Sequence, residues 1–398
     1  MNTDTTAPDG ARARRLCFAT STRADWGLLS PVARAMRELP DVQVQILATN
    51  MHLMPGLGRS ADEIRADGFA IDAEVPMAVE GEGAAARVRG MAQCMAGTAD
   101  ALERLRPDAL VVLGDRYEML AVASAAAVMR VPVIHIAGGE VSQGAVDDDL
   151  RHAITKLSAL HLTATEPYRR RVVQMGEQPD RVLDTGAIGV WNILHRPLMS
   201  RDALEASLGF SLESPLAVVT YHPATLADES PAQCFADLLA ALDDHPRLRV
   251  IITYPNNDTG SDGLIPLIES YAAARPGRVL AVPSLGATRY LSVLQYAQVV
   301  VGNSSSGIVE VPSTGTVTVD VGPRQQGRLC GPSVLHCAEG REAVSAAIAR
   351  ALGPEMQAVA ARRENPYARP DTLGIMTDAI ARFLRHTPPH KHFHDLPC

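Results

Sequence analysis

Short apolar runs alternate with segments of helical spacing along most of the chain, and polar residues gather where the apolar runs end. The region 109–156 shows this pattern most clearly. An apolar run at 109–113 leads into Gly-Asp-Arg, an alanine-rich helical segment follows, and a second apolar run at 131–136 leads into Ala-Gly-Gly-Glu. An acidic helix start comes next. This strand–helix–strand–helix order predicts a parallel sheet covered by helices.

Charged residues collect at the ends of these two strands and at the start of the next helix. They are Asp115, Arg116, Glu140, Asp147, Asp148 and His152. Because ligands of open α/β sheets bind outside the carboxyl ends of the strands, we expect the chemistry at this edge. Crowded carboxylates raise one another's pKa, which suits a general acid or base near neutral pH. For the three aspartates 147–149, an ordinary acidic helix N-terminus and a Mg²⁺ site remain alternatives.

The first half begins with an apolar strand predicted over Leu16–Thr20, followed by a Ser/Thr-rich turn that contains Arg23. Such a turn before a helix presents backbone N–H groups to an anion. It lacks the glycine-rich dinucleotide fingerprint, so the sequence does not support NAD binding. Arg23 is interpreted either as a phosphate-binding group or as a cap for a neighbouring carbonyl. Further strands are expected at 42–49, 161–165 and 182–185, and helices at 28–39, 84–105 and 167–175.

The second half repeats the pattern, with strands predicted at 216–220, 249–253, 299–301 and 316–321. The segment Gly302–Gly307 carries Ser304 and Ser305 and predicts a phosphate cradle, although a serine-capped helix is the simpler alternative. We expect a helix to open at Ile308 and to place Glu310 within reach of a ribose; alone, Glu310 would be an ordinary helix glutamate.

Two further strand ends in this half carry candidate ligand-binding groups. His222 follows the first strand and Arg324 follows the strand at 316–321. A histidine at such an edge donates to a phosphate or assists a leaving group, whereas a lone histidine elsewhere is more often structural.

The pattern predicts an α/β protein of two doubly wound, Rossmann-like domains that face each other across a cleft, the usual place for a small ligand. Residues 1–13 are expected to be disordered and residues 385–398 to form a solvated tail. We expect an N-terminal domain at 14–190, a linker at 191–213, a nucleotide-binding domain at 214–371, and a C-terminal helix at 372–384 that packs back on the N-terminal domain.

Composition narrows the function classes. The 398 residues are 46% apolar, with a net charge of −8 and no basic run, which argues against nucleic-acid binding. Six cysteines without CxxC spacing indicate reduced thiols, and no apolar run approaches the roughly 20 residues that span a bilayer. A cytoplasmic protein without a membrane partner is expected. Histidines in the tail favour a solvated segment over a metal site.

At these positions the sequence resembles the UDP-N-acetylglucosamine 2-epimerase family, and within it the hydrolysing branch of sialic and legionaminic acid synthesis. The matching motifs cover nearly the whole chain in order. They are STRADWG (21–27), MHLMPGLG (51–58), GDRYEML (114–120), HIAGGE (135–140), DDLRHAITKLSALHL (148–162), YHPATL (221–226), NNDTGSD (256–262), GNSSSGIVEVP (302–312), GPRQQGR (322–328) and FHDLP (393–397).

The resemblance implies a GT-B-like fold and a two-step reaction without a cofactor. A base removes the proton at C2 while UDP leaves C1, and water then adds to the resulting 2-acetamidoglucal. It also implies a homodimer or homotetramer. The residues that it assigns to UDP are Arg23, His222, Asn256, Ser304, Ser305, Glu310 and Arg324; those assigned to proton transfer are Asp115, Asp147 and Asp148, with Arg116 near the diphosphate and His152 in support.

One position departs from the family pattern. Several relatives carry Glu or His before Gly-Gly-Glu, where this chain has Ala137. A role at that position would therefore move to Glu140, to an aspartate of 147–149, or to water. The expected substrate is UDP-N-acetylglucosamine; UDP- or GDP-diacetamido-trideoxyglucose, a non-hydrolysing epimerase, a GT-B glycosyltransferase and an inactive nucleotide-sugar sensor are the alternatives.

Overall fold

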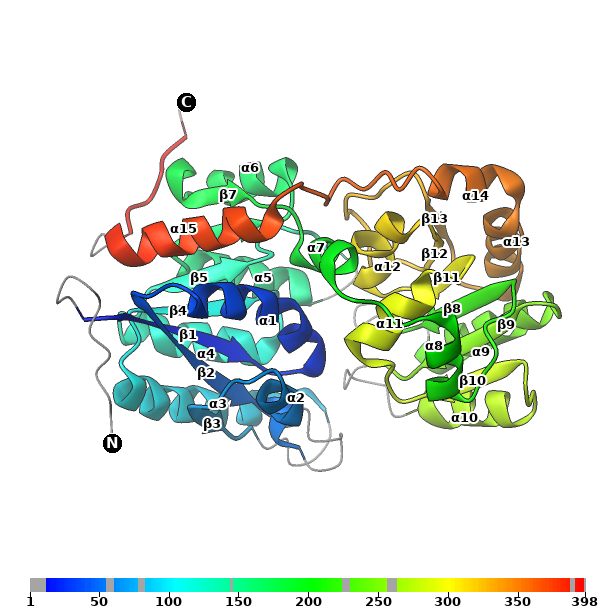
Figure 1. The fold of residues 1–398 in the computed structure, drawn as a ribbon, viewed down its shortest axis with the longest axis horizontal. Helices are drawn as coiled ribbons and strands as arrows, with labels where there is room; N and C mark the ends of the chain where they lie inside the picture. Colours follow the sequence, from blue (N-terminus) through cyan, green and yellow to red (C-terminus); the bar gives the residue numbers. More distant parts are fainter. Residues whose placement is uncertain are drawn as a thin grey trace. The chain divides into compact units, whose positions relative to one another are not determined.

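The computed structural model describes residues 12–54, 61–77, 83–143, 146–223, 230–255, 263–386 and 391–396 (Figure 1). The chain divides into two compact units, each built on its own parallel sheet. The first unit comprises 1–140, 147–191 and 369–398, and the second comprises 141–146 and 192–368. The expected α/β class with two doubly wound sheets is therefore confirmed.

The sheet of the first unit has seven strands in the order β3-β2-β1-β4-β5-β6-β7. The strands are β1 (Arg14–Thr20), β2 (Val42–Thr49), β3 (Ala73–Val75), β4 (Ala109–Leu113), β5 (Val133–Ile136), β6 (Leu160–Thr163) and β7 (Val182–Asp184). The strand order reverses between β1 and β4. In open α/β sheets this reversal opens a crevice beyond the carboxyl ends of the two strands.

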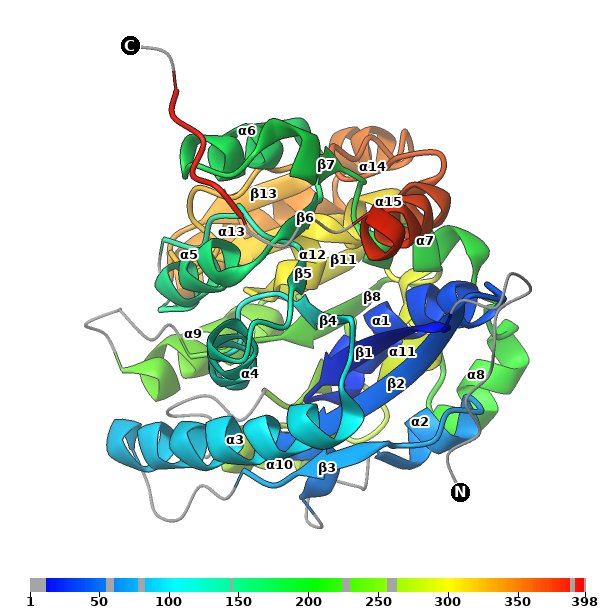
Figure 2. The same ribbon diagram turned by 90° about the vertical axis from the view of Figure 1, so that its left-hand side faces the viewer.

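The helices of this unit are α1 (Arg23–Arg37), α2 (Ala61–Ala66), α3 (Ala84–Leu105), α4 (Tyr117–Val128), α5 (Asp147–Leu157), α6 (Glu166–Gln174), α7 (Ile188–His195) and α15 (Thr372–His386). Helices α1 and α15 contact each other on one side of the sheet, and α3 lies beside α4 on the other (Figure 2).

The alternation of β1 explains how one strand serves two cores. Leu16 and Phe18 belong to the core under α1 and α15, whereas Cys17 and Ala19 face the core under α3 and α4. Successive strand side chains point to opposite faces, so a strand covered on both sides is apolar throughout. The buried Phe383 of α15 contributes to the first core, and each such side chain stabilises the fold by about 1.5–3 kcal/mol.

The second unit has a six-stranded parallel sheet in the order β10-β9-β8-β11-β12-β13. The strands are β8 (Leu216–Thr220), β9 (Arg249–Thr253), β10 (Val279–Val282), β11 (Val299–Gly302), β12 (Val317–Val321) and β13 (Val334–Cys337). Its helices are α8 (Arg201–Leu208), α9 (Pro231–Asp243), α10 (Ile265–Ala273), α11 (Gly286–Leu294), α12 (Ser305–Val309), α13 (Arg341–Leu352) and α14 (Pro354–Ala360). The order reverses between β8 and β11, which gives this unit a crevice of the same kind.

The segment 191–213, expected to be a linker, contains the end of α7 and the whole of α8. Glycine, proline and asparagine around α7 suggested irregular structure, but two of its apolar residues are core residues: Ile188 in the first unit and Ile193 in the second. Ser200 caps α8 by accepting from the Ala203 backbone N–H, and Gly209 ends it in a left-handed conformation.

The described residues nearest the chain ends, 12–13 and 391–396, include contacts that the sequence does not indicate. Ala13 is buried and Arg12 donates to Asp108 at 2.7 Å, although disorder was expected through residue 13. In the tail, the ammonium of Lys391 lies 2.8 Å from the buried carboxylate of Glu177, which also accepts from His161 at 2.9 Å. This ion pair holds Lys391 in place, while Phe393 and Leu396 are 65% and 48% exposed, so the described tail is anchored at Lys391 and largely exposed beyond it.

Among the described residues no helix is long and apolar enough to cross a membrane. The five cysteines in the described ranges are free thiols. The same part of the chain contains no group of three or more His, Cys, Asp and Glu side chains arranged to hold a metal ion, including the three aspartates that begin α5.

Candidate active site

The loops after β1, β4 and β5 carry the candidate residues of the first unit, and a buried arginine joins them. Arg151 on α5 has a side chain that is only 1% exposed. Its guanidinium pairs with Asp115, donates to Asp148 at 3.0 Å, and donates to the backbone carbonyl of Glu140 at 3.0 Å. One cation therefore connects the strand ends of β4 and β5 with the first turn of α5.

This cation changes the electrostatics that the sequence suggests. Crowded carboxylates repel each other, but here a positive charge lies between Asp115 and Asp148 and offsets that repulsion. The two carboxylates remain partly accessible, at 27% and 25% exposed, while the cation is closed off. Arg151 thus fixes the orientation of two carboxylates whose oxygens remain accessible from solvent.

The structure distinguishes the aspartates at the start of α5. Asp148 is held by Arg151 and lies 3.8 Å from His152 Nε2, whereas Asp149 is exposed and Asp147 is half-buried. Partial burial lowers the pKa of His152, so its imidazole is neutral at neutral pH. A neutral histidine next to a carboxylate is a proton acceptor.

A second pair of charges follows the same strand, β4. Arg116 Nε is 2.5 Å from Oε1 of Glu118, a fully buried side chain. Burial acts to raise the pKa of Glu118, but the guanidinium of Arg116 outweighs it and lowers that pKa. Burial likewise raises the pKa of Asp25, whose carboxylate accepts from Ser21 Oγ at 2.6 Å and completes the capping box of α1 with Thr22.

Arg23, for which the sequence left two roles open, forms an ion pair with Glu63 of α2 at 2.8 Å. Its side chain is 30% exposed. An exposed pair of this kind contributes at most about 1 kcal/mol, so it leaves the guanidinium able to exchange partners.

Two glycines and a histidine shape the loop after β5. A Cβ on Gly138 would lie 2.9 Å from His135 Nδ1, and a Cβ on Gly139 would lie 2.6 Å from the carbonyl of Tyr168. His135 bridges the Gly114 carbonyl at 2.7 Å and Thr155 Oγ1 at 3.1 Å, and burial lowers its pKa to about 3. The neutral ring therefore links β5 to the residue after β4 and to α5 through these two hydrogen bonds. Ala137 adopts a positive φ of 65° at the bend.

In the second unit, Asn303 joins the loops after β8, β11 and β12. Its amide accepts from the His222 backbone N–H at 2.7 Å and donates to the His222 carbonyl at 2.8 Å. Its own carbonyl accepts from Arg324 at 3.1 Å and from Gln325 at 2.8 Å. A Cβ on Gly302 would lie 1.9 Å from the Thr220 carbonyl, so only glycine allows the two strand ends to approach.

The helix expected from Ile308 instead begins at Ser305 and ends at Val309, so Glu310 follows it. A five-residue helix has little macrodipole, and the anion-binding donors of this turn are its hydroxyl and N–H groups. The Glu310 carboxylate accepts from Ser306 Oγ, which also contacts Tyr290 Oη at 2.8 Å. Burial raises the pKa of Glu310.

Most of the residues predicted from the sequence thus lie beyond the carboxyl ends of the strands, in one group in each unit. Asp115, Asp148 and His152 lie around Arg151, and His222 and Arg324 are linked through Asn303. Ser304 is half-buried and Ser305 is exposed beside them, while Asn256 lies outside the described residues. The sequence interpretation missed Arg151, Glu118 and Asn303. The spacing of Asp148 and Arg151, three residues apart on a helix, was the one local signal.

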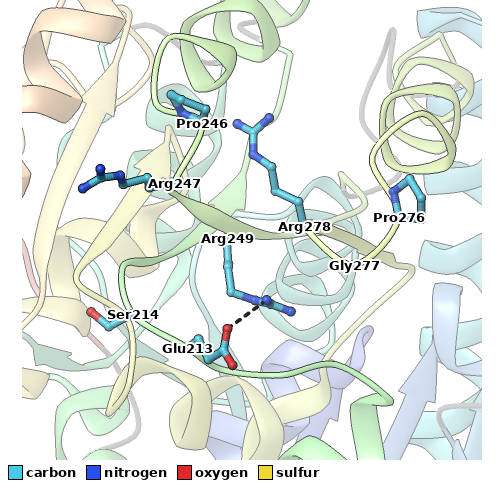
Figure 3. Close-up of a pocket in the computed structure, with 8 residues that line it drawn as sticks. All are labelled: Glu213, Ser214, Pro246, Arg247, Arg249, Pro276, Gly277 and Arg278. Carbon is cyan, nitrogen blue, oxygen red and sulfur yellow. Dashed lines mark hydrogen bonds and ion pairs between the residues drawn. The ribbon is translucent and has the colours of Figure 1, made fainter.

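A surface pocket of the second unit lies elsewhere. Glu213, Ser214, Pro246, Arg247, Arg249, Pro276, Gly277 and Arg278 line it, at the amino ends of β8, β9 and β10 (Figure 3). Arg278 is engaged by Asp243 at 3.0 Å and Arg249 by Glu213 at 3.3 Å. These ion pairs and the position at the opposite strand ends separate the pocket from the candidate site.

Comparison with known proteins identifies the family of this chain. The family model described as UDP-N-acetylglucosamine 2-epimerase matches residues 34–381. The Campylobacter jejuni GDP/UDP-N,N'-diacetylbacillosamine 2-epimerase (hydrolyzing) is 35% identical over 322 residues, which cover 81% of this chain and 84% of that protein. The Escherichia coli polysialic acid biosynthesis protein P7 is 33% identical over 386 residues, covering 96% of this chain and 98% of that protein.

Solved structures extend the similarity to the fold. UDP-GlcNAc 2-epimerase from Neisseria meningitidis, bound to UDP-GlcNAc, superposes with a TM-score of 0.76 at 15% identity, covering 92% of this chain and 100% of that chain. The chain therefore belongs to the UDP-N-acetylglucosamine 2-epimerase family and is a UDP-sugar 2-epimerase.

Proposed function

We propose that this enzyme is a hydrolysing 2-epimerase that converts UDP-N-acetylglucosamine into N-acetylmannosamine and UDP. A base removes the C2 proton, the C1–O bond to UDP breaks, and a 2-acetamidoglucal forms. Water then delivers hydroxide to C1 and a proton to C2 on the opposite face. Because the C2 proton is weakly acidic, elimination needs a positioned base and stabilisation of the departing diphosphate.

The observation that carries the proposal is the cation of Arg151, which orients the carboxylates of Asp115 and Asp148 beside a neutral His152. We assign the two proton transfers to these three groups, with Glu140 and Asp147 as further candidates. Groups fixed in orientation before the substrate arrives need no reorganisation during the reaction.

We assign the UDP moiety to the second unit. Arg324, His222, Ser304 and Ser305 would bind the diphosphate through their donors, and Glu310 would accept from the ribose hydroxyls. Asn303 supports this assignment because it fixes His222 and Arg324 relative to each other. Arg23, Arg116 and Asn256 complete the proposed set.

The test is a product analysis by NMR in D₂O with purified enzyme and UDP-N-acetylglucosamine. We expect free N-acetylmannosamine deuterated at C2, together with UDP. Intact UDP-N-acetylmannosamine would contradict hydrolysis, and a product without deuterium at C2 would contradict the elimination step.

A second substrate has specific support. The Campylobacter jejuni relative is named for N,N'-diacetylbacillosamine, whereas the Escherichia coli relative, which aligns over nearly its whole length, is named for polysialic acid biosynthesis. The two nucleotide sugars differ at C4 and C6. Parallel measurements of kcat/KM decide between them, and a value at least about tenfold higher for UDP-N-acetylglucosamine is expected, since one good contact changes kcat/KM by this order. The reverse ratio would assign the diacetamido sugar.

A further inference from the structure

A cysteine, a histidine and a buried aspartate, none of which has a role in the proposed reaction, form a hydrogen-bonded line in the second unit. Cys330 Sγ lies 3.3 Å from His336 Nε2, and His336 Nδ1 lies 2.8 Å from Asp320 Oδ2. Asp320 stands on β12 and His336 is its paired neighbour on β13. The strand register therefore fixes the carboxylate–imidazole contact, and the loop before β13 brings the thiol to the other ring nitrogen.

The charges of this line favour a cationic imidazole. The Asp320 side chain is 2% exposed, and its second oxygen, Oδ1, is buried without a hydrogen-bond partner among the described residues. A buried carboxylate with a single partner strongly favours a positive partner. The hydrogen bonds that His336 donates to Asp320 and Cys330 accordingly raise the pKa of His336 to about 10, so the ring is protonated at neutral pH.

The His336 cation lies within hydrogen-bond distance of Cys330 Sγ, and the thiolate is the nucleophilic form of cysteine. The line is also accessible, because the His336 side chain is 54% exposed and Cys330 is half-exposed. Cys337 directly follows His336 on β13, is partly buried, and has no imidazole partner among the described residues; burial and the charge of Asp320 raise its pKa to about 11. It provides a reference thiol close to Cys330 in the chain.

We propose that Cys330, His336 and Asp320 form a reactive-thiol site at which the enzyme is modified by small disulfides. The Cys330 thiolate attacks one sulfur of the disulfide and forms a mixed disulfide. The other sulfur leaves as a thiolate and is protonated by solvent, which had taken up the proton of the Cys330 thiol, while His336 keeps its proton. One disulfide bond breaks as another forms, so the small disulfide is the oxidant, and a small thiol reverses the modification.

The site adjoins a loop that the family motifs single out. Cys330 Sγ donates to the Arg328 carbonyl at 3.2 Å, and Arg328 donates to Ser142 Oγ at 3.1 Å. The backbone N–H of Gln143 donates to the Gln326 carbonyl at 3.2 Å. A mixed disulfide removes the S–H donor and adds bulk at one end of this loop.

The test uses the full chain at neutral pH with limiting iodoacetamide, followed by peptide mass spectrometry, which gives the alkylation rate at Cys330 and Cys337 in one sample. We expect Cys330 to react at least about tenfold faster, the order by which an activated thiolate exceeds an ordinary one at neutral pH. Oxidised glutathione should then add one glutathione per chain at Cys330, and dithiothreitol should remove it.

Two variants distinguish activation of the Cys330 thiol by His336 from an effect of solvent exposure alone. His336→Gln keeps the thiol and its accessibility but removes the imidazolium, so the Cys330 rate should fall at least about tenfold. Cys337→Ser should leave the Cys330 rate unchanged, and circular dichroism confirms that both variants are folded. Equal rates at the two cysteines in the parent chain, or an unchanged Cys330 rate in folded His336→Gln, would overturn the proposal.

Discussion

The side-chain amide of Asn303 is hydrogen-bonded to both backbone polar groups of His222, accepting from its N–H at 2.7 Å and donating to its carbonyl at 2.8 Å. The amide bonds to His222 as the backbone of a neighbouring strand would. It therefore links the loops that follow β8 and β11. Both bonds are buried. The position of His222 therefore depends on a residue 81 positions later in the chain.

Asn303→Ala should weaken UDP binding about tenfold and lower the free energy of unfolding by about 1–3 kcal/mol, because it leaves buried backbone groups unpaired. Calorimetric titration with UDP and thermal unfolding measure the two effects. Gln357→Ala is the matched control, since the Gln357 amide donates to the carbonyls of Gln298 and Ala351 away from the candidate site. That variant should lose stability but retain its UDP affinity; equal losses of affinity in both variants would contradict the assignment.

Replacement of Arg151 by methionine should remove activity and strongly destabilise the first unit. The substitution leaves Asp115 and Asp148 facing each other without a cation, and breaking such a pair costs about 3–5 kcal/mol. Denaturant unfolding and kcat/KM are the measurements. Arg169→Met, which removes an arginine paired with the exposed Glu166, should change stability by less than about 1 kcal/mol. If both substitutions lowered the free energy of unfolding equally, the ion pairs of Arg151 would contribute no more than an exposed pair does.

Asp148→Asn and Asp149→Asn form a matched pair on one helical turn. Asp148 contacts Arg151 and His152, whereas Asp149 is exposed, so only the first variant should lower kcat, by a factor of about 10²–10⁴. Deuterium incorporation at C2 should fall in parallel with kcat. An unaffected Asp148→Asn enzyme would transfer the role to Asp115, Asp147 or Glu140.

The apolar pattern predicted the elements that arrange these residues. The expected bounds of β2, α3, β8 and β9 coincide with those in the structure, because the periodicity of each changes clearly at both ends. The strand-end rule then indicated Asp115, Asp148 and His222. The sequence could not indicate Arg151 or Asn303, because their roles come from contacts 36 and 81 residues apart. An arginine on a polar helix face is normally exposed, and only the fold makes this one buried.

The contact made by the C-terminal tail also could not be predicted from the local sequence. Lys391 contacts Glu177 across more than 200 residues, and no local pattern relates them. The expected solvated tail followed from composition, which is informative about average exposure but not about a single buried ion pair.

Lowering the pH should reduce the free energy of unfolding of the first unit, because the Glu177 carboxylate becomes protonated. Burial acts to raise the pKa of Glu177, but hydrogen bonds from His161, Lys156 and Lys391 outweigh it and hold that pKa at about 2. A carboxylate with a depressed folded pKa contributes stability that is present above its unfolded pKa of 4.5 and is lost as pH falls from there toward about 2. Unfolding free energies of the parent chain and of Glu177→Gln should therefore differ most at neutral pH and converge as the pH falls below about 2. Glu166→Gln is the control: arginine pairs also lower the pKa of Glu166, but these pairs are exposed, so its difference from the parent should stay below about 1 kcal/mol. A gap between the parent and Glu177→Gln that stays constant down to about pH 2 would contradict the linkage.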